Sequence, residues 1–424
     1  MQTEAIAETS RHAVVAPRSC RFCSAPLQRT FVDLGMSPLC ETYPEAKDFQ
    51  KGEVYYPLHV YTCERCFLVQ LEEYEKVENI FTDYLYFSSF SDSWLAHCEK
   101  YCFSMAQRFG LNKQSFVVEV ASNDGYLLQY FVRQQIPVLG VEPAANVARV
   151  AVEKGVPTVV RFFGVQAAKD LVAERGGADL VLGNNVLAQV PDLNDFVEGL
   201  KIMLKSGGIL TLEFPHLLRL IEWNEFDTIY HEHFSYFSLL TAIKILAAHG
   251  LKVFDVDELP THGGSLRVYA CGAENVLQQV QPSVARVLTD EKNAGLETPE
   301  GYERFAAQVK ETKFALVEFL MSAARAGKKV AGYGAPGKSA TLLHYCGIGR
   351  DLIRFTVDRS PHKQGRYLPG THIPIHHPDK IREERPDYVV ILPWNLKDEI
   401  MRQLGFIRDW GGKFVVPIPS VKVY

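Results

Sequence analysis

The sequence has no uninterrupted apolar run that approaches the roughly 18 residues of a membrane-spanning helix. It also has no excess of basic residues, because 45 lysines and arginines stand against 50 aspartates and glutamates, for a formal net charge of -5. A chain without a positive field is a poor partner for a phosphate backbone. Residues 1–17 lack an apolar signal core. We therefore expect a cytoplasmic protein that binds neither membranes nor nucleic acid.

Length and composition favour a packed enzyme of several domains. At roughly 100–200 residues per domain, 424 residues suggest two to four, and 47% hydrophobic with 22% charged residues is ordinary globular usage. Strand candidates alternate with helix-like segments, which predicts an α/β fold. We expect three domains: a zinc-binding domain at 1–80, a Rossmann-like domain at 81–280, and a second Rossmann-like domain at 281–424.

The cysteines do not suggest a disulfide framework, because nine is an odd number and four of them form two Cys-x-x-Cys pairs. These pairs are Cys20 with Cys23 and Cys63 with Cys66. Two such turns can supply the four thiolates of a tetrahedral zinc site, and a site closed by four thiolates is structural. The alternative is a redox pair with two incidental thiols.

A strand, turn and helix pattern begins the central region. The apolar segment 116–120 runs into the turn Ala121–Gly125, and a helix-like segment follows. Ala121 and Asn123 occupy the first two glycine positions of the Gly-x-Gly-x-x-Gly pattern, which disfavours a pyrophosphate cradle. The turn suits a cofactor without phosphates, whose cationic amino-acid end can pair with a carboxylate. The residues that we expect to bind this cofactor here are Glu119, Ala121, Asn123, Asp124 and Gly125.

Two later strands add polar residues at the same sheet edge. Glu142 ends segment 138–142, where a doubly wound fold presents a carboxylate to ribose hydroxyls. Asn184 and Asn185 follow segment 178–182 and are candidates for the adenosine or methionine part. Together these residues predict binding of S-adenosylmethionine. A closing hairpin, 251–256 with 265–270, is typical of class I methyltransferases by fold analogy.

The segment 230–238 crowds titratable and phenolic side chains into a loop at the cofactor edge. His231 or His233 can take a proton, Glu232 can orient one of them, and Tyr230 can donate to an enolate oxygen. The alternatives are a metal site of His231, Glu232 and His233, or a structural histidine pair. His262, in a nearby glycine turn, contacts substrate or belongs to an ordinary tight turn.

Seven segments in order resemble the sugar C-3'-methyltransferases of deoxysugar biosynthesis, and the resemblance spans nearly the whole chain. They are the two Cys-x-x-Cys pairs, 119–125, 140–146, 185–188, 227–238, 262–267 and 332–335. The resemblance implies a nucleotide-linked 4-keto-6-deoxyhexose, such as a dTDP-sugar, whose ketone acidifies the C-3' hydrogen. A base removes that hydrogen, and the enolate takes the methyl group.

The same resemblance assigns catalytic roles. It makes His233 the base, Tyr230 and Glu232 supporting groups, and Tyr84 or Tyr86 a further pocket residue. Tyr84 and Tyr86 lie in an aromatic, hydroxyl-rich segment whose alternative role is an aromatic core staple. Gln189 departs from the family, which commonly has histidine there.

A second strand, turn and helix pattern begins the C-terminal region at 328–339. Gly332 to Ser339 meets the spacing of a P-loop, but Pro336 lies inside the loop and no magnesium carboxylate follows. We interpret it as a turn that contacts phosphate. By resemblance this region holds the nucleotide end, with Lys338 and Asn395 as candidate contacts; their other roles are surface charge and helix cap.

Two other functions remain open at this point. The two Rossmann-like turns also suit an NAD(P)-dependent sugar-nucleotide oxidoreductase. A non-enzymatic, zinc-dependent interaction module is the third hypothesis.

Overall fold

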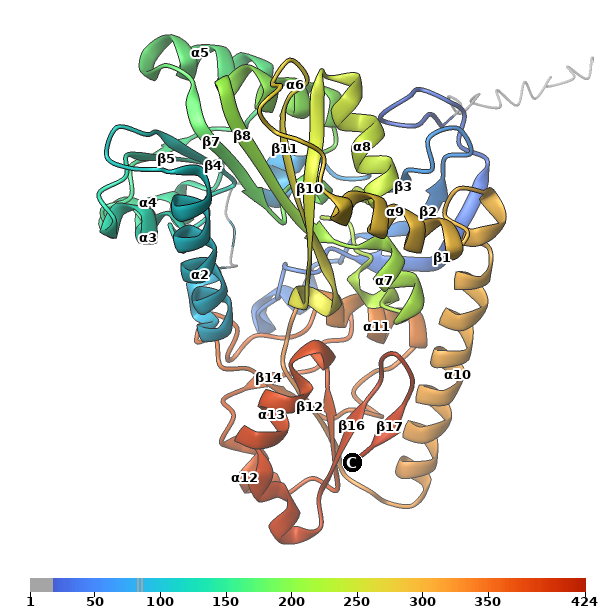
Figure 1. Ribbon diagram of the computed structural model, residues 1–424. Coiled ribbons are helices and arrows are strands. Elements are labelled where there is room, and N and C mark those ends of the chain that lie inside the picture. The colour runs from blue at the N-terminus through green and yellow to red at the C-terminus, as the bar shows by residue number, and fades with distance from the viewer. Residues whose placement is uncertain (1–17, 82–83, 85–86) are drawn as a thin grey trace, which may run out of the picture.

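The computed structural model describes residues 18–81, 84 and 87–424 (Figure 1). Tyr86, one of the two pocket tyrosines proposed from the sequence, lies outside the described residues. Over the described residues the chain forms a four-stranded, a seven-stranded and a six-stranded sheet. The predicted α/β class is confirmed. No helix within this part of the chain is long and apolar enough to cross a membrane.

The N-terminal sheet is antiparallel and includes a strand from the central region. Strands β1 (Arg29–Pro38), β2 (Tyr55–Thr62) and β3 (Val69–Leu71) follow one another in the chain and in the sheet. The fourth strand is β9 (Ser235–Tyr236), which pairs with β3 through Val69 opposite Tyr236. The loop that precedes β9 is thereby fixed to the N-terminal sheet.

The central sheet has the strand order β10-β11-β8-β7-β4-β5-β6. Every pairing in it is parallel except those of β11. Its middle strands are short apolar runs buried on both faces, as expected for a covered parallel sheet. The strand bounds are β4 (Val117–Val120), β5 (Val138–Glu142), β6 (Thr158–Val160), β7 (Ala178–Asn184), β8 (Leu204–Pro215), β10 (Leu251–Leu259) and β11 (Ser265–Gly272).

The C-terminal sheet has the order β14-β13-β12-β15-β16-β17, and only β17 runs antiparallel to its neighbour. This is a second Rossmann-like sheet, as the sequence predicts. The strand bounds are β12 (Val330–Tyr333), β13 (Thr356–Val357), β14 (Ile375–His376), β15 (Tyr388–Ile391), β16 (Lys413–Val416) and β17 (Lys422–Val423).

Helices cover the sheets and connect their strands. The longest of them is α10 (Arg304–Arg325), which runs along one side of the molecule toward the C-terminal sheet (Figure 1). The other helices are α1 (Val77–Phe81), α2 (Asp92–Phe109), α3 (Leu128–Arg133), α4 (Ala145–Glu153), α5 (Val165–Arg175), α6 (Leu193–Met203), α7 (Leu217–Glu222), α8 (Leu239–Ala248), α9 (Pro282–Asn293), α11 (Lys338–Cys346), α12 (Lys380–Glu384) and α13 (Lys397–Gln403).

The hydrophobic cores cross the predicted domain boundaries. Phe31 and Val60 of the N-terminal sheet share one core with Leu316 of α10 and Val389 of β15. Helix α9 follows the predicted boundary at residue 281, yet it packs on β10 and α8 of the central region. The three parts therefore meet along continuous apolar contacts, and their junction is rigidly packed.

Candidate active site

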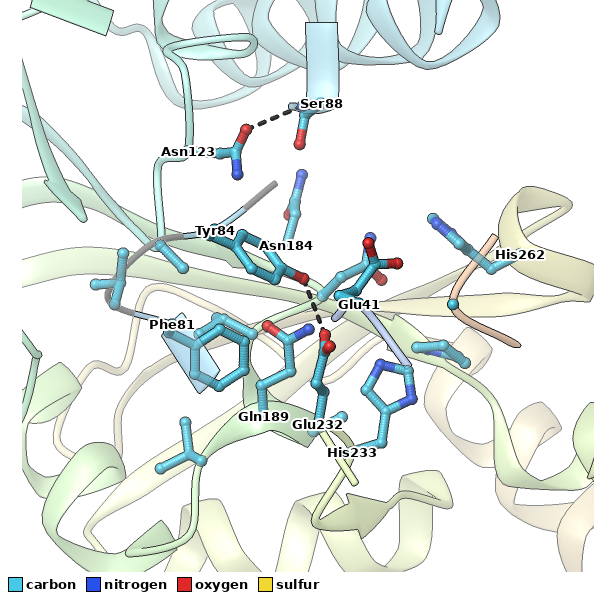
Figure 2. Close-up of a pocket in the computed structure, with 18 of the residues that line it drawn as sticks. Glu41, Phe81, Tyr84, Ser88, Asn123, Asn184, Gln189, Glu232, His233 and His262 are labelled. Carbon is cyan, nitrogen blue, oxygen red and sulfur yellow. Dashed lines mark hydrogen bonds between the residues drawn. The ribbon is translucent and has the colours of Figure 1, made fainter. Parts of the chain in front are cut away.

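A cavity of about 940 Å³ opens where the three parts meet (Figure 2). The N-terminal part contributes Glu41 to its wall, the central part contributes Glu232 and His233, and the C-terminal part contributes Lys338 and Lys363. The cavity lies at the carboxyl ends of β4, β5 and β7, the edge where doubly wound sheets bind their ligands.

The loop before β9 is anchored by buried apolar side chains, which decide which of its polar residues face the cavity. Phe226, Ile229 and Phe234 are almost completely buried, the first two in the core that the N-terminal and C-terminal parts share. Tyr230, Glu232 and His233 line the cavity between these anchors.

His233 is held in one tautomer by the backbone. Its Nδ1 lies 3.0 Å from the carbonyl oxygen of Thr228, which can only accept, so Nδ1 carries the proton and Nε2 keeps its lone pair. The Tyr230 ring packs on the imidazole with 4.1 Å between ring centroids. Burial lowers the pKa of His233 to about 4. The imidazole is therefore neutral at pH 7, as a proton acceptor must be.

The pKa of Glu232 is shifted in the opposite direction to that of His233. Its carboxyl group accepts hydrogen bonds from the Tyr84 hydroxyl at 3.0 Å and from the Cys40 thiol at 3.3 Å. Burial and the nearby carboxyl group of Glu41 raise the pKa of Glu232 to about 8. Glu232 therefore carries a proton at pH 7 and can donate a hydrogen bond to an oxygen on which negative charge develops.

His231 points away from this chemistry. Its Nε2 lies 3.2 Å from the carbonyl oxygen of Pro57, and its ring packs edge-on against Tyr56 and Tyr74. Among the described residues, the only histidine, cysteine or acidic side chains that converge as a group of three or more are the four cysteines. The alternative of a metal site at His231, Glu232 and His233 is wrong, because the two histidines face different parts of the molecule.

The cofactor side of the cavity is built from loops with left-handed backbone. Ala121, Asn123 and Asn185 all have positive φ angles, between 48° and 57°. Ala121, Asn123, Glu142, Asn184 and Asn185 line the cavity. Glu142 accepts hydrogen bonds from the backbone amides of Asn123 and Ala144, each at 2.9 Å, so it holds the turn beside the cavity.

Asn184 supplies a direct test of whether a ligand fits here. The residue is only 6% exposed, and neither its Oδ1 nor its Nδ2 makes a hydrogen bond within the described part of the chain. A buried amide left without partners costs free energy unless a ligand or water satisfies it. Donor and acceptor on one wall, with Glu142 near by, fit the polar groups of S-adenosylmethionine.

The other three residues predicted to bind the cofactor lie behind the cavity wall. Glu119 is fully buried against Tyr126, and burial raises its pKa well above the usual range. Asp124 forms an ion pair with Lys154 at 3.0 Å. Gly125 packs so closely on Val156 that an added Cβ would lie 3.0 Å from its side chain. In this geometry all three shape the turn, and none of them lines the cavity.

The predicted substrate residues meet on the side facing the C-terminal sheet. Lys338 donates to the side-chain oxygen of Asn395 at 2.7 Å and lies 4.1 Å from the Trp394 ring centroid. His262 adopts a φ of 56° in its turn and contacts the edge of the Trp94 ring. Lys338, Asn395 and His262 line the same cavity as His233. The structure brings them together although they are far apart in the sequence.

The four predicted metal ligands converge at the start of the N-terminal sheet. The sulfur atoms of Cys20, Cys23, Cys63 and Cys66 lie within 4.8 Å of one another, and two pairs are 3.5 Å apart. Ligands about 2.3 Å from zinc at tetrahedral angles are about 3.8 Å apart. The cluster therefore fits zinc. Gln70 donates to the Cys20 sulfur at 3.1 Å and supports the site from outside.

Sequence analysis missed two residues of the cavity wall, Glu41 and Lys363. Neither belongs to a recognisable motif, and both reach the cavity only because the N-terminal and C-terminal parts pack together. His97 of α2 also lines the cavity and contacts Glu213 of β8 at 2.9 Å; it was missed because a single histidine in a helix belongs to no motif.

The strand order of the central sheet, with β11 reversed inside a parallel array, and the cavity at its carboxyl edge define a class I S-adenosylmethionine-dependent methyltransferase. Family models match along the chain: a putative zinc binding domain at 20–81, a methyltransferase domain at 94–256 and a C-methyltransferase C-terminal domain at 260–419. The chain is 36% identical over 404 residues to the C-methyltransferase NovU of Streptomyces niveus, which covers 95% of this chain and 96% of NovU. The chain therefore belongs to this family of zinc-containing C-methyltransferases.

Solved structures resemble only part of the chain. A putative S-adenosylmethionine-dependent methyltransferase from Listeria monocytogenes is 17% identical, with a TM-score of 0.34, over 42% of this chain and all of that one. A methyltransferase from Anabaena variabilis is 14% identical, with a TM-score of 0.35, over 42% of this chain and 86% of that one. The protein is an enzyme, and neither the oxidoreductase nor the interaction-module hypothesis is supported.

Proposed function

We propose that the protein transfers a methyl group from S-adenosylmethionine to C-3' of a nucleotide-linked 4-keto-6-deoxyhexose, such as a dTDP-sugar. The observation that carries this proposal is the pairing, in one cavity, of a neutral imidazole with a protonated carboxyl group. A carbon next to a ketone loses a proton only if a base takes it while the developing oxyanion is stabilised.

In this proposal the chain divides the work among neighbouring residues. His233 Nε2 accepts the hydrogen of the sugar carbon, while its Nδ1 stays bonded to the Thr228 carbonyl. Glu232 donates to the ketone oxygen as it becomes an enolate, and Tyr84 keeps that carboxyl group in place. When bound, S-adenosylmethionine supplies a methyl group on a cationic sulfur, which the carbon nucleophile takes.

The C-terminal part suits the nucleotide end of the substrate. Lys338 begins helix α11 directly after the turn at Gly334–Gly337, and it lies beside Asn395. A cation at a helix N-terminus, next to a glycine-containing turn, is a common arrangement for binding phosphate.

Tyr230 packs on His233 and keeps the imidazole facing the cavity.

The test is methyl transfer from labelled S-adenosylmethionine to a panel of 4-keto sugar nucleotides. Mass spectrometry gives the product mass, and NMR locates the new methyl group. Addition at C-3' is the expected result. Since the ketone also acidifies the hydrogen at C-5', a methyl group found there would correct the position and keep the class of reaction. No transfer to any 4-keto sugar nucleotide would refute the proposal.

The residue test is His233→Asn. We expect S-adenosylmethionine to bind as before and turnover to fall about 100- to 10,000-fold, the usual contribution of a general base. His231→Asn is the matched control, because its ring contacts Pro57 and Tyr56 outside the cavity. Unchanged turnover in His233→Asn would remove this residue from the mechanism.

A further inference from the structure

The cavity wall contains an ion pair whose members come from the first and last parts of the chain. Glu41 follows β1, and Lys363 follows β13; the Glu41 Oε2 and Lys363 Nζ atoms are 3.5 Å apart. Lys363 also donates to the Tyr43 hydroxyl at 2.7 Å and to the Ala335 carbonyl at 2.9 Å. Both charged residues line the cavity beside Glu232.

The pair is rigidly built. Lys363 is 7% exposed and Tyr43 is fully buried, so the ammonium group has one position between its partners. On the other side, Gly337 approaches Glu41 so closely that an added Cβ would lie 2.8 Å from Oε1. Glu41 Oε2 is buried and has no hydrogen-bond partner within the described residues, although it faces the lysine. The Glu41 carboxylate, which lines the cavity, therefore has hydrogen-bonding capacity that the described residues do not use.

The Glu41–Lys363 pair also lies next to Glu232, the proposed hydrogen-bond donor to the ketone oxygen. The residue before Glu41 is Cys40, whose thiol donates to Glu232 Oε1 at 3.3 Å. Figure 2 shows Glu41 beside the hydrogen bond between Tyr84 and Glu232. A sugar whose ketone contacts Glu232 would therefore place a neighbouring ring substituent at Glu41.

The charges at this end of the cavity balance. Lys363 matches the single charge that Glu41 can carry, and Glu232 holds a proton at pH 7 because its pKa is raised to about 8. Asp358 also acts on Glu41, but its carboxylate accepts from the amides of Ala335 and Ser360 and does not line the cavity. Among the described residues at this end of the cavity, no uncompensated negative charge remains to attract a cation.

We propose that Glu41 and Lys363 form a specificity element that accepts a neutral hydroxyl group on the sugar carbon next to the ketone and rejects an ammonium group there. A hydroxyl group donates to the Glu41 carboxylate and adds no charge. An amino substituent is largely protonated near neutral pH, and because Lys363 already neutralises Glu41, no net charge at the pair offsets the free energy of removing that ammonium group from water. This inference rests on the proposed function and narrows its substrate.

The experiment compares initial rates of methyl transfer to two 4-keto-6-deoxy sugar nucleotides that differ only in a hydroxyl or amino group next to the ketone. We expect the wild-type enzyme to prefer the hydroxyl sugar about 100-fold. Lys363→Met leaves Glu41 without its cation, so the preference should fall at least about tenfold or invert. Glu41→Gln keeps the lysine and should slow the hydroxyl sugar while the amino sugar stays poor.

Glu53→Gln is the matched control. Glu53 is another N-terminal carboxylate that meets the C-terminal part, through His372 at 2.6 Å, but it does not line the cavity. The substrate preference of the Glu53→Gln variant should equal that of the wild-type enzyme. Thermal unfolding and S-adenosylmethionine binding check each variant, and Glu41→Gln carries the test if Lys363→Met does not fold.

The outcomes separate the two proposals. If the wild-type enzyme methylates the amino sugar as well as or better than the hydroxyl sugar, the inference is overturned and the proposed function stands. The same holds if the preference is unchanged in both Lys363→Met and Glu41→Gln. If neither sugar is methylated, the proposed function fails and the inference falls with it.

Discussion

Glu232 and His233 are adjacent in the chain, and burial shifts their pKa values in opposite directions. Removing a charged group from water favours the neutral form, so the histidine loses its proton more easily and the glutamic acid keeps its proton longer. Between about pH 4 and pH 8 both groups are neutral, one as an acceptor and one as a donor. This pairing suits the removal of a proton from carbon, because neither group needs a counter-ion.

The pH dependence of turnover follows from these values. The rate should rise with pH through about 4, as His233 loses its proton, and should fall through about 8, as Glu232 loses its proton. The measurement is kcat across this range with saturating substrates, alongside thermal unfolding at each pH. An acid limb centred near the ordinary histidine value of about 6.5 would contradict the role of a buried His233.

Single residues show the limits of prediction from sequence. The His-Glu-His segment was recognisable, but its spacing could not decide which histidine faces the cavity, because buried apolar neighbours such as Phe226, Ile229 and Phe234 fix the course of the loop. Glu119 and Asp124 have the acidic character that a cofactor site needs, yet the packing of the turn places them behind the wall. Burial is a property of the fold and is not visible in a short motif.

At the scale of elements, the predictions were more accurate. The parallel strands are apolar runs and the β10–β11 hairpin alternates, so local pattern alone places them. The pairing of β9 with β3 was not predicted, because two residues carry no periodic signal and their partners lie far back in the chain. For the same reason, the sequence does not predict that Glu41 lies close to Lys363.

The turn before α11 allows a test of how closely two elements must approach. Gly337 has an ordinary helical φ of -49°, so alanine is compatible with its backbone, but the added Cβ would displace Glu41 and Cys40. We expect Gly337→Ala to change stability by less than about 1 kcal/mol, because a flexible side chain can move. Turnover should fall and substrate preference should weaken.

The control is Gly52→Ala, at a position where an added Cβ meets nothing within 4 Å. Initial rates and thermal unfolding of both variants provide the comparison. Wild-type kinetics in Gly337→Ala would show that the position of Glu41 does not matter to the reaction.

At the scale of the whole molecule, the four cysteines do not line the cavity, but the elements around them are connected to the loop that does. The backbone carbonyl of Cys66 accepts from Thr241 of α8, and Asn194 of α6 donates to the carbonyls of Arg21 and Phe22. The last strand of the N-terminal sheet is β9, which follows directly after the loop that carries Glu232 and His233. Loss of zinc should therefore disturb both the sheet and the loop.

Removal of the metal with a chelator, or the change Cys23→Ser, should lower the unfolding temperature and abolish methyl transfer. The affinity for S-adenosylmethionine should fall less than turnover does, because the residues proposed to bind this cofactor lie on the central sheet. Zinc content, calorimetry and cofactor titration measure these effects. Cys346→Ala, a buried cysteine outside the cluster, is the control. Full activity in metal-free protein would contradict a structural role for the cluster.

The position of Glu41 on the N-terminal segment has a consequence for how such enzymes diversify. His233 and the loops proposed to hold the cofactor are encoded in the middle of the gene, whereas Glu41 of the same cavity wall is encoded near its start and its partner Lys363 near its end. Exchanging the first 80 codons between two relatives would therefore move Glu41 without its lysine, and we expect substrate choice to be transplanted only when both ends of the gene are exchanged together.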